Sequence, residues 1–263
     1  MDKRFCFTVD DNIRVFKELT AGNYDSLFDH PYLAMYRRLH EKHALKVQLN
    51  LFYACEGFTL SEMTDRYRRE FAENADWLKM SFHSRIENVR PYETSAYDEV
   101  FDDCSRVENE IVRFASEGTL AKTTTIHFCL LTKEGIRAME DRGTYGLLGL
   151  YGDNSAPRLS YQTAEKDAVR IREGQNVLDG KIAYAGIDIV LNLYKTEENL
   201  ARLKDLYGRS LIKGMIHEQY FYPDYPYYQK EFEEKLDAVF SALGDAGYLS
   251  TFFENALFGK EQQ

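Results

Sequence analysis

Short stretches that alternate apolar and polar side chains follow amphipathic stretches of helical period along most of the chain. Residues 46–53 alternate in this way, which is typical of a strand with one buried face. In residues 30–42 the apolar side chains recur every three or four positions, which predicts a helix. The other expected strands are 4–9, 78–82, 123–131, 145–151, 187–193, 212–219 and 248–253. The other expected helices are 60–74, 97–116, 133–141, 197–207 and 232–243.

About seven strand–helix units in one chain favour a parallel sheet that closes into an α/β barrel. A polar region, about 153–185, holds only weak strands at 159–161, 169–171 and 181–184. We expect it to form a small β-rich insertion over one rim. An open, doubly wound sheet is the alternative, but the Gly-rich turn that often follows its first strand is absent. No Pro-rich linker divides the sequence, so we expect residues 1–263 to form a single domain.

The charge and the apolar content exclude several classes of partner. The chain has 33 Lys and Arg against 43 Asp and Glu, a net charge of −10. This argues against nucleic acid and against anionic membranes as partners, since both attract clustered positive charge. No apolar run approaches the ~20 residues that cross a bilayer. The apolar stretch at 5–9 is shorter than a secretory signal requires, so we expect a cytoplasmic protein.

Titratable side chains gather where the predicted strands end. Asp10 and Asp11 end the first strand, His83 ends the third, and His127 and His217 lie in later strands. In a parallel barrel the carboxyl ends of the strands form the active-site face. Each residue alone has a simpler explanation, because paired acids often cap helices and a single histidine is often structural. Together they indicate a site, since burying so many titratable groups is costly.

His83 and Glu87 are four residues apart. If the turn between them is helical, both side chains lie on one face, where they could bind a divalent metal. A helix-cap contact on a solvated turn explains the same spacing equally well.

The order of these motifs resembles that of the polysaccharide deacetylase superfamily, of the NodB type. The sequence is Phe-Thr-Val-Asp-Asp at 7–11, Ser-Phe-His-Ser at 81–84 and Ile-His at 216–217. The resemblance implies a distorted barrel of about seven β/α units. It also implies hydrolysis of the amide bond of N-acetylated sugars with a bound metal, often zinc; a branch of the superfamily hydrolyses cyclic amides.

The resemblance also implies roles for individual residues. Asp10 matches the general base and His217 the late catalytic histidine, while Asp11 and His83 match two metal ligands. Glu87 stands where the family has its second metal histidine.

His127, in strand four, is a further candidate ligand. We therefore expect a divalent metal held by Asp11, His83 and one of Glu87 or His127. Zinc is the first choice, and a carboxylate-containing site also suits iron or manganese.

Six aromatic residues crowd into residues 220–228, which also contain two prolines. Rigid aromatic side chains make good stacking surfaces for a small-molecule or oligosaccharide substrate. We expect Tyr220, Tyr222 and Tyr225 to form a substrate wall. A loop packed against the barrel edge is the alternative.

Three functions remain open from the sequence. The first is a metal-dependent hydrolase of C–N bonds, most like a carbohydrate deacetylase, in which Glu218 is the reserve base if Asp10 is not the base. The second is a non-catalytic barrel that binds a carbohydrate or another partner through the tyrosine loop. The third is a glycosidase that uses paired carboxylates such as Asp11 and Glu87.

Overall fold

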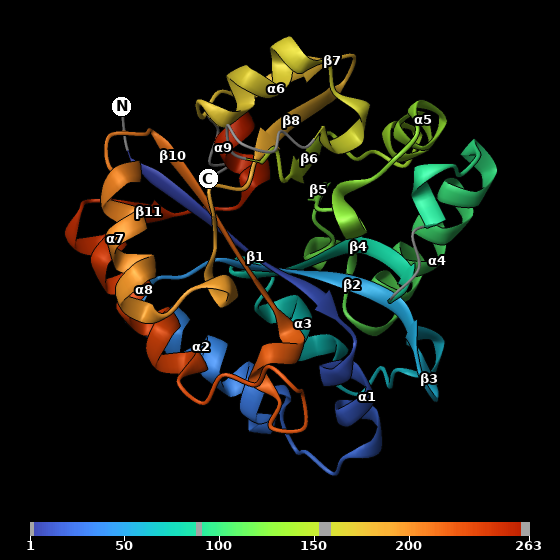
Figure 1. Ribbon diagram of the computed structural model, residues 1–263. Coiled ribbons are helices and arrows are strands. Elements are labelled where there is room, and N and C mark those ends of the chain that lie inside the picture. The colour runs from blue at the N-terminus through green and yellow to red at the C-terminus, as the bar shows by residue number, and fades with distance from the viewer. Residues whose placement is uncertain (1–2, 88–90, 153–158, 259–263) are drawn as a thin grey trace.

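Parallel strands form the wall of a distorted barrel, and most of the helices lie around its outside (Figure 1). The computed structural model describes residues 3–87, 91–152 and 159–258. Strand β1 lies between β2 and β10, parallel to both, and β4 extends the sheet beyond β2. The strands of this first sheet are β1 (Arg4–Asn12), β2 (Val47–Cys55), β3 (Phe58–Thr59), β4 (Leu78–Ile86), β9 (Ile189–Val190), β10 (Leu211–His217) and β11 (Leu249–Ser250).

A second, smaller sheet closes the other side of the barrel. Its strands are β5 (Thr123–Thr124), β6 (Gly146–Gly149), β7 (Val177–Asp179) and β8 (Ile182–Gly186). All neighbours are parallel except the antiparallel pair of β7 and β8. The amide of Ala121 donates to the Met80 carbonyl at 2.8 Å, and the amide of Asp188 donates to the Lys213 carbonyl at 2.8 Å. The first bond joins the two sheets between β4 and β5. On the other side the chain itself runs from β8 through Ile187 and Asp188 into β9, which pairs with β10.

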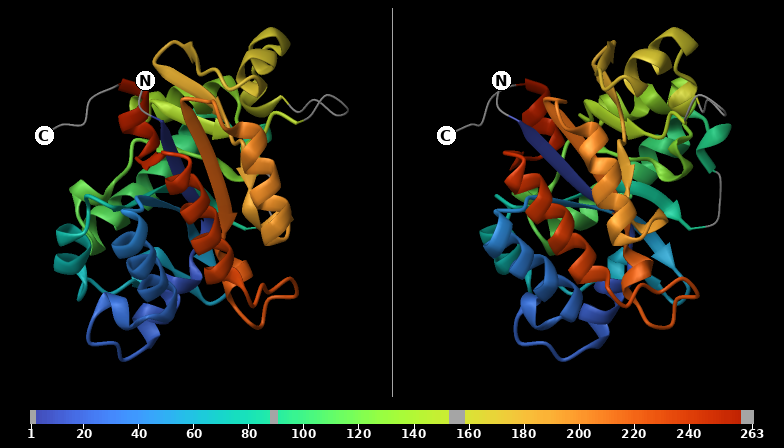
Figure 2. Two further views of the ribbon diagram at one scale, coloured as in Figure 1. Left: turned by 90° about the vertical axis from the view of Figure 1, so that its left-hand side faces the viewer. Right: turned by 60° about the vertical axis from the view of Figure 1, so that its left-hand side comes forward.

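Helices surround the wall, as the two side views in Figure 2 show. They are α1 (Arg14–Ala21), α2 (Pro31–His43), α3 (Arg68–Glu73), α4 (Tyr97–Phe114), α5 (Lys133–Asp141), α6 (Glu165–Arg172), α7 (Thr196–Leu206), α8 (Phe232–Asp245) and α9 (Phe253–Phe258). Short 3-10 turns include η5 (His127–Cys129), η6 (Ser160–Gln162), η7 (Leu191–Leu193) and η8 (Glu218–Phe221). None of the helices in the described residues is both long and apolar enough to span a bilayer.

The alternation along β1 separates the main core from the barrel interior. Phe5 and Phe7 point outward and pack on Phe240 of α8, with ring centroids 5.7 and 5.0 Å apart. Cys6 points inward and packs with residues of β6 and β8 in a second, smaller cluster. Asp10 has the same parity as Cys6, and it lies at the carboxyl end of the strand. The period of two along a strand therefore directs Asp10 into the mouth of the barrel.

Several predicted elements differ from those observed. The strand expected at 123–131 is only the two-residue β5, because the chain turns at Phe128 and Cys129, where φ is 58° and 55°. The weak strand expected at 169–171 is wrong, since these residues belong to helix α6. The weak strand at 181–184 corresponds to β8, a strand of the barrel wall. Residues 153–158 of the expected insertion lie outside the described residues, and the single domain over 1–263 stays a prediction.

Candidate active site and metal centre

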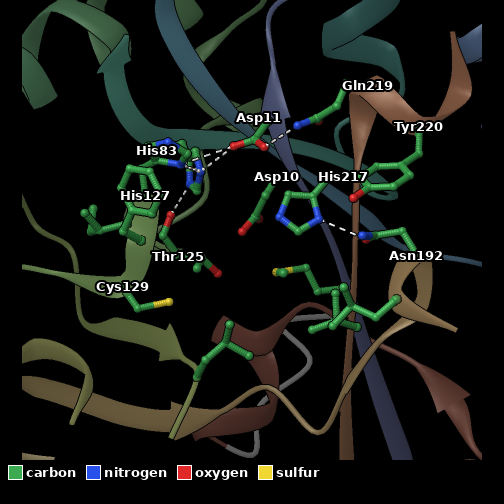
Figure 3. Close-up of a pocket in the computed structure, with 16 residues that line it drawn as sticks. Asp10, Asp11, His83, Thr125, His127, Cys129, Asn192, His217, Gln219 and Tyr220 are labelled. Atoms are coloured by element: carbon green, nitrogen blue, oxygen red, sulfur yellow. Dashed lines mark hydrogen bonds and ion pairs between the residues drawn. The ribbon is translucent and has the colours of Figure 1, made fainter. Parts of the chain in front are cut away.

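A cavity of about 310 Å³ opens at the carboxyl ends of β1, β4 and β10. Its polar lining includes Asp10, Asp11, His83, His127, Asn192, His217, Gln219 and Tyr220. Figure 3 shows these side chains converging from several strands. Six of the residues that the sequence singled out therefore share one cavity: Asp10, Asp11, His83, His127, His217 and Tyr220.

Asp10 and Asp11 are consecutive, so in a regular strand their side chains would point to opposite faces. The register between β1 and β2 shifts between Val9 and Asn12, as at a β-bulge. Asp11 has a φ of 65°, in the left-handed region that is costly for a residue with a Cβ. This local irregularity brings the second carboxylate into the mouth beside the first. Bulges often re-aim a side chain next to an active site.

Asp11, His83 and His127 form a compact cluster. The Oδ1 atom of Asp11 lies 3.0 Å from Nε2 of His83 and 3.3 Å from Nδ1 of His127. These two nitrogens are 3.1 Å apart. All three ligand atoms lie within 4.8 Å of one another, as required of groups that could bind one metal ion.

The hydrogen bonds around the cluster fit a cation. Nδ1 of His83 donates to the carbonyl of Thr125, which can only accept. In a neutral His83 the Nε2 atom therefore presents a lone pair to the Asp11 carboxylate, which also has only lone pairs to offer. Two such atoms at 3.0 Å repel each other unless a proton or a metal ion lies between them. A metal-binding histidine commonly donates its other N–H to a carbonyl in this way.

The electrostatics favour an ionised Asp11. Burial by itself would raise the pKa of Asp11, but the hydrogen bonds to His127 and His83 outweigh it and hold the pKa well below its usual range. The outer oxygen, Oδ2, accepts a 2.7 Å hydrogen bond from Nε2 of Gln219. Asp11 thus keeps the negative charge that a metal ligand needs, and its orientation is fixed from both sides.

Asp10 and His217 lie side by side at the mouth because they are direct partners in the register of the adjacent strands β1 and β10. Asp10 accepts a 2.6 Å hydrogen bond from Nδ2 of Asn50. Burial raises the pKa of Asp10, and the nearby His83 and His217 oppose this rise. Nδ1 of His217 donates to Oδ1 of Asn192 at 2.9 Å, which leaves its Nε2 free of that bond. One acid–base pair therefore lies beside the cluster.

Glu87 is not part of the cluster. Strand β4 extends through Ile86, so the helical turn considered for 83–87 does not form. Four residues of extended chain span ~13 Å, which is too far for two ligands of one ion. The exposed side chain of Glu87 instead lines a neighbouring cavity, which Asp11 and Gln219 also line. His127 occupies the third position of the cluster.

The carboxylate of Glu218, which the sequence offered as the alternative general base, points away from the cavity. It is fully buried and accepts hydrogen bonds from the backbone amides of Ile13, Arg14 and Val15 at 2.8–2.9 Å. These amides begin α1, so Glu218 caps that helix from the 3-10 turn η8, which follows β10. Burial raises the pKa of Glu218 to about 7, against the lowering effect of the three amides.

The three tyrosines of the expected substrate wall lie in different places. Tyr220 lines the cavity, with its ring centroid 6.2 Å from that of His217. Tyr225 packs edge-on against Tyr220, 5.1 Å between centroids. Tyr222 is buried, stacked on Tyr32 and covered by the guanidinium of Arg14. Tyr222 does not line this cavity, whereas Tyr220 does.

Sequence reasoning missed three polar residues of the site: Asn50, Asn192 and Gln219. Asn192 lies near the end of the expected strand 187–193, and Gln219 ends the expected strand 212–219. The strand-end rule that found the histidines would have found both of these residues if it had been applied to amides. Asn50 lies within β2 and carries no such signal.

No family sequence model matches the chain, and no curated protein matches it in sequence. Solved structures do match its fold. A 4-alpha-glucanotransferase from Thermococcus litoralis matches 99% of this chain and 41% of its own, at 13% identity and a TM-score of 0.64. A family 4 acetyl xylan esterase from Clostridium thermocellum, in complex with a cobalt ion, matches 98% of this chain and 92% of its own, at 12% identity and a TM-score of 0.56. A CE4 family pseudoenzyme from Bacillus anthracis matches 97% of this chain and 66% of its own, at 11% identity and a TM-score of 0.54.

This chain thus spans two thirds or less of two of these three proteins, and the identities are low enough that the likeness concerns the fold. The expected barrel is confirmed. The chain has the distorted (β/α)7 barrel fold of the CE4 polysaccharide deacetylases, as its motifs had indicated.

Proposed function

We propose that the chain is a metal-dependent hydrolase of amide C–N bonds that acts on an N-acylated carbohydrate, either a small molecule or an oligosaccharide. The observation that carries this proposal is the Asp11–His83–His127 cluster, in one cavity with Asp10 and His217. The donor set, one carboxylate and two imidazoles, suits zinc first and also iron or manganese. The cobalt ion in the acetyl xylan esterase of the same fold supports a divalent metal.

When bound, the metal would polarise the amide carbonyl and make a water molecule more acidic. Asp10 accepts the proton from the attacking water, and Asn50 holds the carboxylate in place for this transfer. The raised pKa of Asp10 makes it a better base than an ordinary aspartate. His217 donates a proton from Nε2 to the departing nitrogen as the C–N bond breaks, since its Nδ1 is committed to Asn192. The products are a carboxylic acid and an amine.

The two alternatives have less support. In a glycosidase, Asp11 would have to act as one of two free carboxylates, yet both of its oxygens are engaged and Glu87 lines another cavity. A non-catalytic barrel is consistent with the fold of the pseudoenzyme. It gives no reason, however, for an acid–base pair and a metal-type cluster to share one cavity.

The experiment combines elemental analysis with acetate release. Protein prepared without chelators should contain about one divalent metal per chain. It should release acetate from N-acetylated chito-oligosaccharides, and a chelator should stop the release. Asp10→Asn should keep the metal and lose turnover, whereas Asp11→Ala should lose both. Absence of both metal and acetate release would refute the proposal. Metal-free protein that binds the sugars would support the non-catalytic alternative.

A further inference from the structure

A second cavity lies next to the first, with a volume of about 600 Å³. The two cavities share a wall made of Leu150, Val190 and Leu193. Leu193 is 62% exposed, one of the few large apolar side chains that face solvent. Leu193 is therefore accessible from solvent beside both cavities. An exposed apolar side chain between two cavities suits contact with a ligand.

Positive charge is concentrated in this second cavity. Arg172, Arg202 and Arg209 line it, together with Asp188 and Asp205. Asp188 is already paired twice: its Oδ1 lies 2.5 Å from Nη1 of Arg209, and its Oδ2 lies 3.0 Å from Nζ of the buried Lys213. Three arginines and two carboxylates line the cavity, and the buried Lys213, which does not line it, also pairs with Asp188, in a chain whose net charge is −10. A local positive excess of this kind attracts an anionic group.

Arg202 is the residue best able to receive such a group. Its guanidinium lies 3.7 Å from the ring centroid of Tyr194, close enough for a cation–π contact. In the described part of the chain it has no hydrogen bond or ion pair. Stacking holds the guanidinium plane and leaves its N–H edge available. That edge matches the geometry of a carboxylate or a phosphate. Arg209 differs, because Asp188 and the Arg172 carbonyl already occupy its N–H groups.

We propose that the second cavity is a subsite for an anionic group of the substrate, a carboxylate or a phosphate, held by Arg202. This inference rests on the proposed hydrolase function. It narrows the substrate to an N-acylated sugar that carries a negative charge. The amide lies at the Asp11–His83–His127 cluster, the body of the sugar contacts Leu193, and the anionic group reaches Arg202.

The test compares three sugars that share one N-acetyl group. The probes are N-acetylglucosamine, its 6-phosphate and its 6-carboxylate, the uronic acid. Binding is measured by calorimetry on Asp10→Asn protein, in which turnover is blocked. We expect at least one charged sugar to bind about tenfold more tightly than the neutral one, and this advantage to shrink with added salt. Whichever charged sugar binds more tightly identifies the anionic group.

Arg202→Gln should remove most of the advantage of the charged sugar and leave the neutral sugar unaffected. Arg137→Gln is the matched control. Arg137 is also exposed and also lies over a tyrosine, with its guanidinium 5.8 Å from the ring centroid of Tyr97, but it lines neither cavity. Equal binding of all three sugars, no binding of any of them, or the same loss in both variants would overturn the subsite.

Acetate release by the unmodified protein separates the subsite from the proposed function. Release from all three sugars at equal kcat/KM would support the hydrolase function and refute the subsite. Binding that depends on Arg202, without acetate release from any sugar, would keep the subsite and refute the hydrolase.

Discussion

The two sheets of the barrel present their functional groups in different ways. In the first sheet, β1, β2, β4 and β10 are seven to nine residues long and hold continuous register over most of their length. They supply Asp10, Asp11, His83 and His217. In the second sheet, β5, β6 and β8 are two to five residues long. The segments near these strands supply His127 and much of the apolar wall.

The difference shows where position follows from regular structure and where it depends on a turn. Asp10 and His217 meet because they are register partners on adjacent strands. His127 instead follows a two-residue strand and precedes two residues with positive φ. A hydrogen bond from the Ile126 amide to the hydroxyl of Tyr161, at 3.2 Å, supports this segment. The segment that follows the short strand β5 of the second sheet therefore completes a site whose other residues come from the long strands of the first sheet.

The variants with the largest expected effect test whether both sheets supply a metal ligand. His83→Ala and His127→Ala should each reduce metal content to well below one ion per chain. Each should also reduce turnover by about 10⁴-fold, since a metal contributes several kcal/mol to the transition state. Elemental analysis and acetate release check this. Full metal content in His127→Ala would mean that the second sheet supplies only part of the cavity wall and no metal ligand.

The next effect concerns the acid–base pair. His217→Ala should lower kcat by ~10²–10⁴-fold and leave the metal in place, as expected for loss of a general acid. Asn192→Ala should lower kcat by about tenfold, because Asn192 only orients the imidazole. Steady-state kinetics with metal analysis measures both. Equal losses in the two variants would show that the orientation of His217 matters as much as its proton.

A third prediction concerns the link between the end of β10 and helix α1. The pKa of Glu218 rises on folding from 4.5 to about 7. Between these pH values the folded protein holds a proton that the unfolded chain has released. The free energy of unfolding should therefore fall as the pH rises through this window.

The matched variant is Glu218→Gln, which cannot titrate. Urea unfolding at several pH values should show a flatter pH dependence for the variant than for the unmodified protein. The difference between the two curves isolates Glu218 from other carboxylates, such as Asp10. Parallel curves would show that the three amides keep Glu218 ionised across the window.

The smallest effect separates the tyrosines. Tyr220→Ala should raise KM by about fivefold with little change in kcat, because stacking stabilises ground and transition states alike. Tyr222→Phe should change neither, since Tyr222 is buried outside the cavity. A lower kcat in Tyr220→Ala would instead mean that Tyr220 helps to position His217.

Sequence reasoning located the parts of the site that depend on regular structure. The alternation in 46–53 predicts β2, and the strand-end rule places Asp10, His83 and His217 at one face. Both arguments need only the period of a strand and the polarity of a parallel barrel. They work without knowledge of which residues touch.

The tertiary structure decided what local pattern cannot express. His127 rather than Glu87 completes the cluster, and it lies 44 positions from His83. Gln219 orients Asp11 across 208 positions. Tyr222 is buried although its neighbour Tyr220 lines the cavity. Such placements depend on turns, bulges and contacts between distant segments, whose energies are set only when the barrel closes. The sequence by itself therefore determined the barrel and most of its polar residues, and closure of the barrel determined which of them meet.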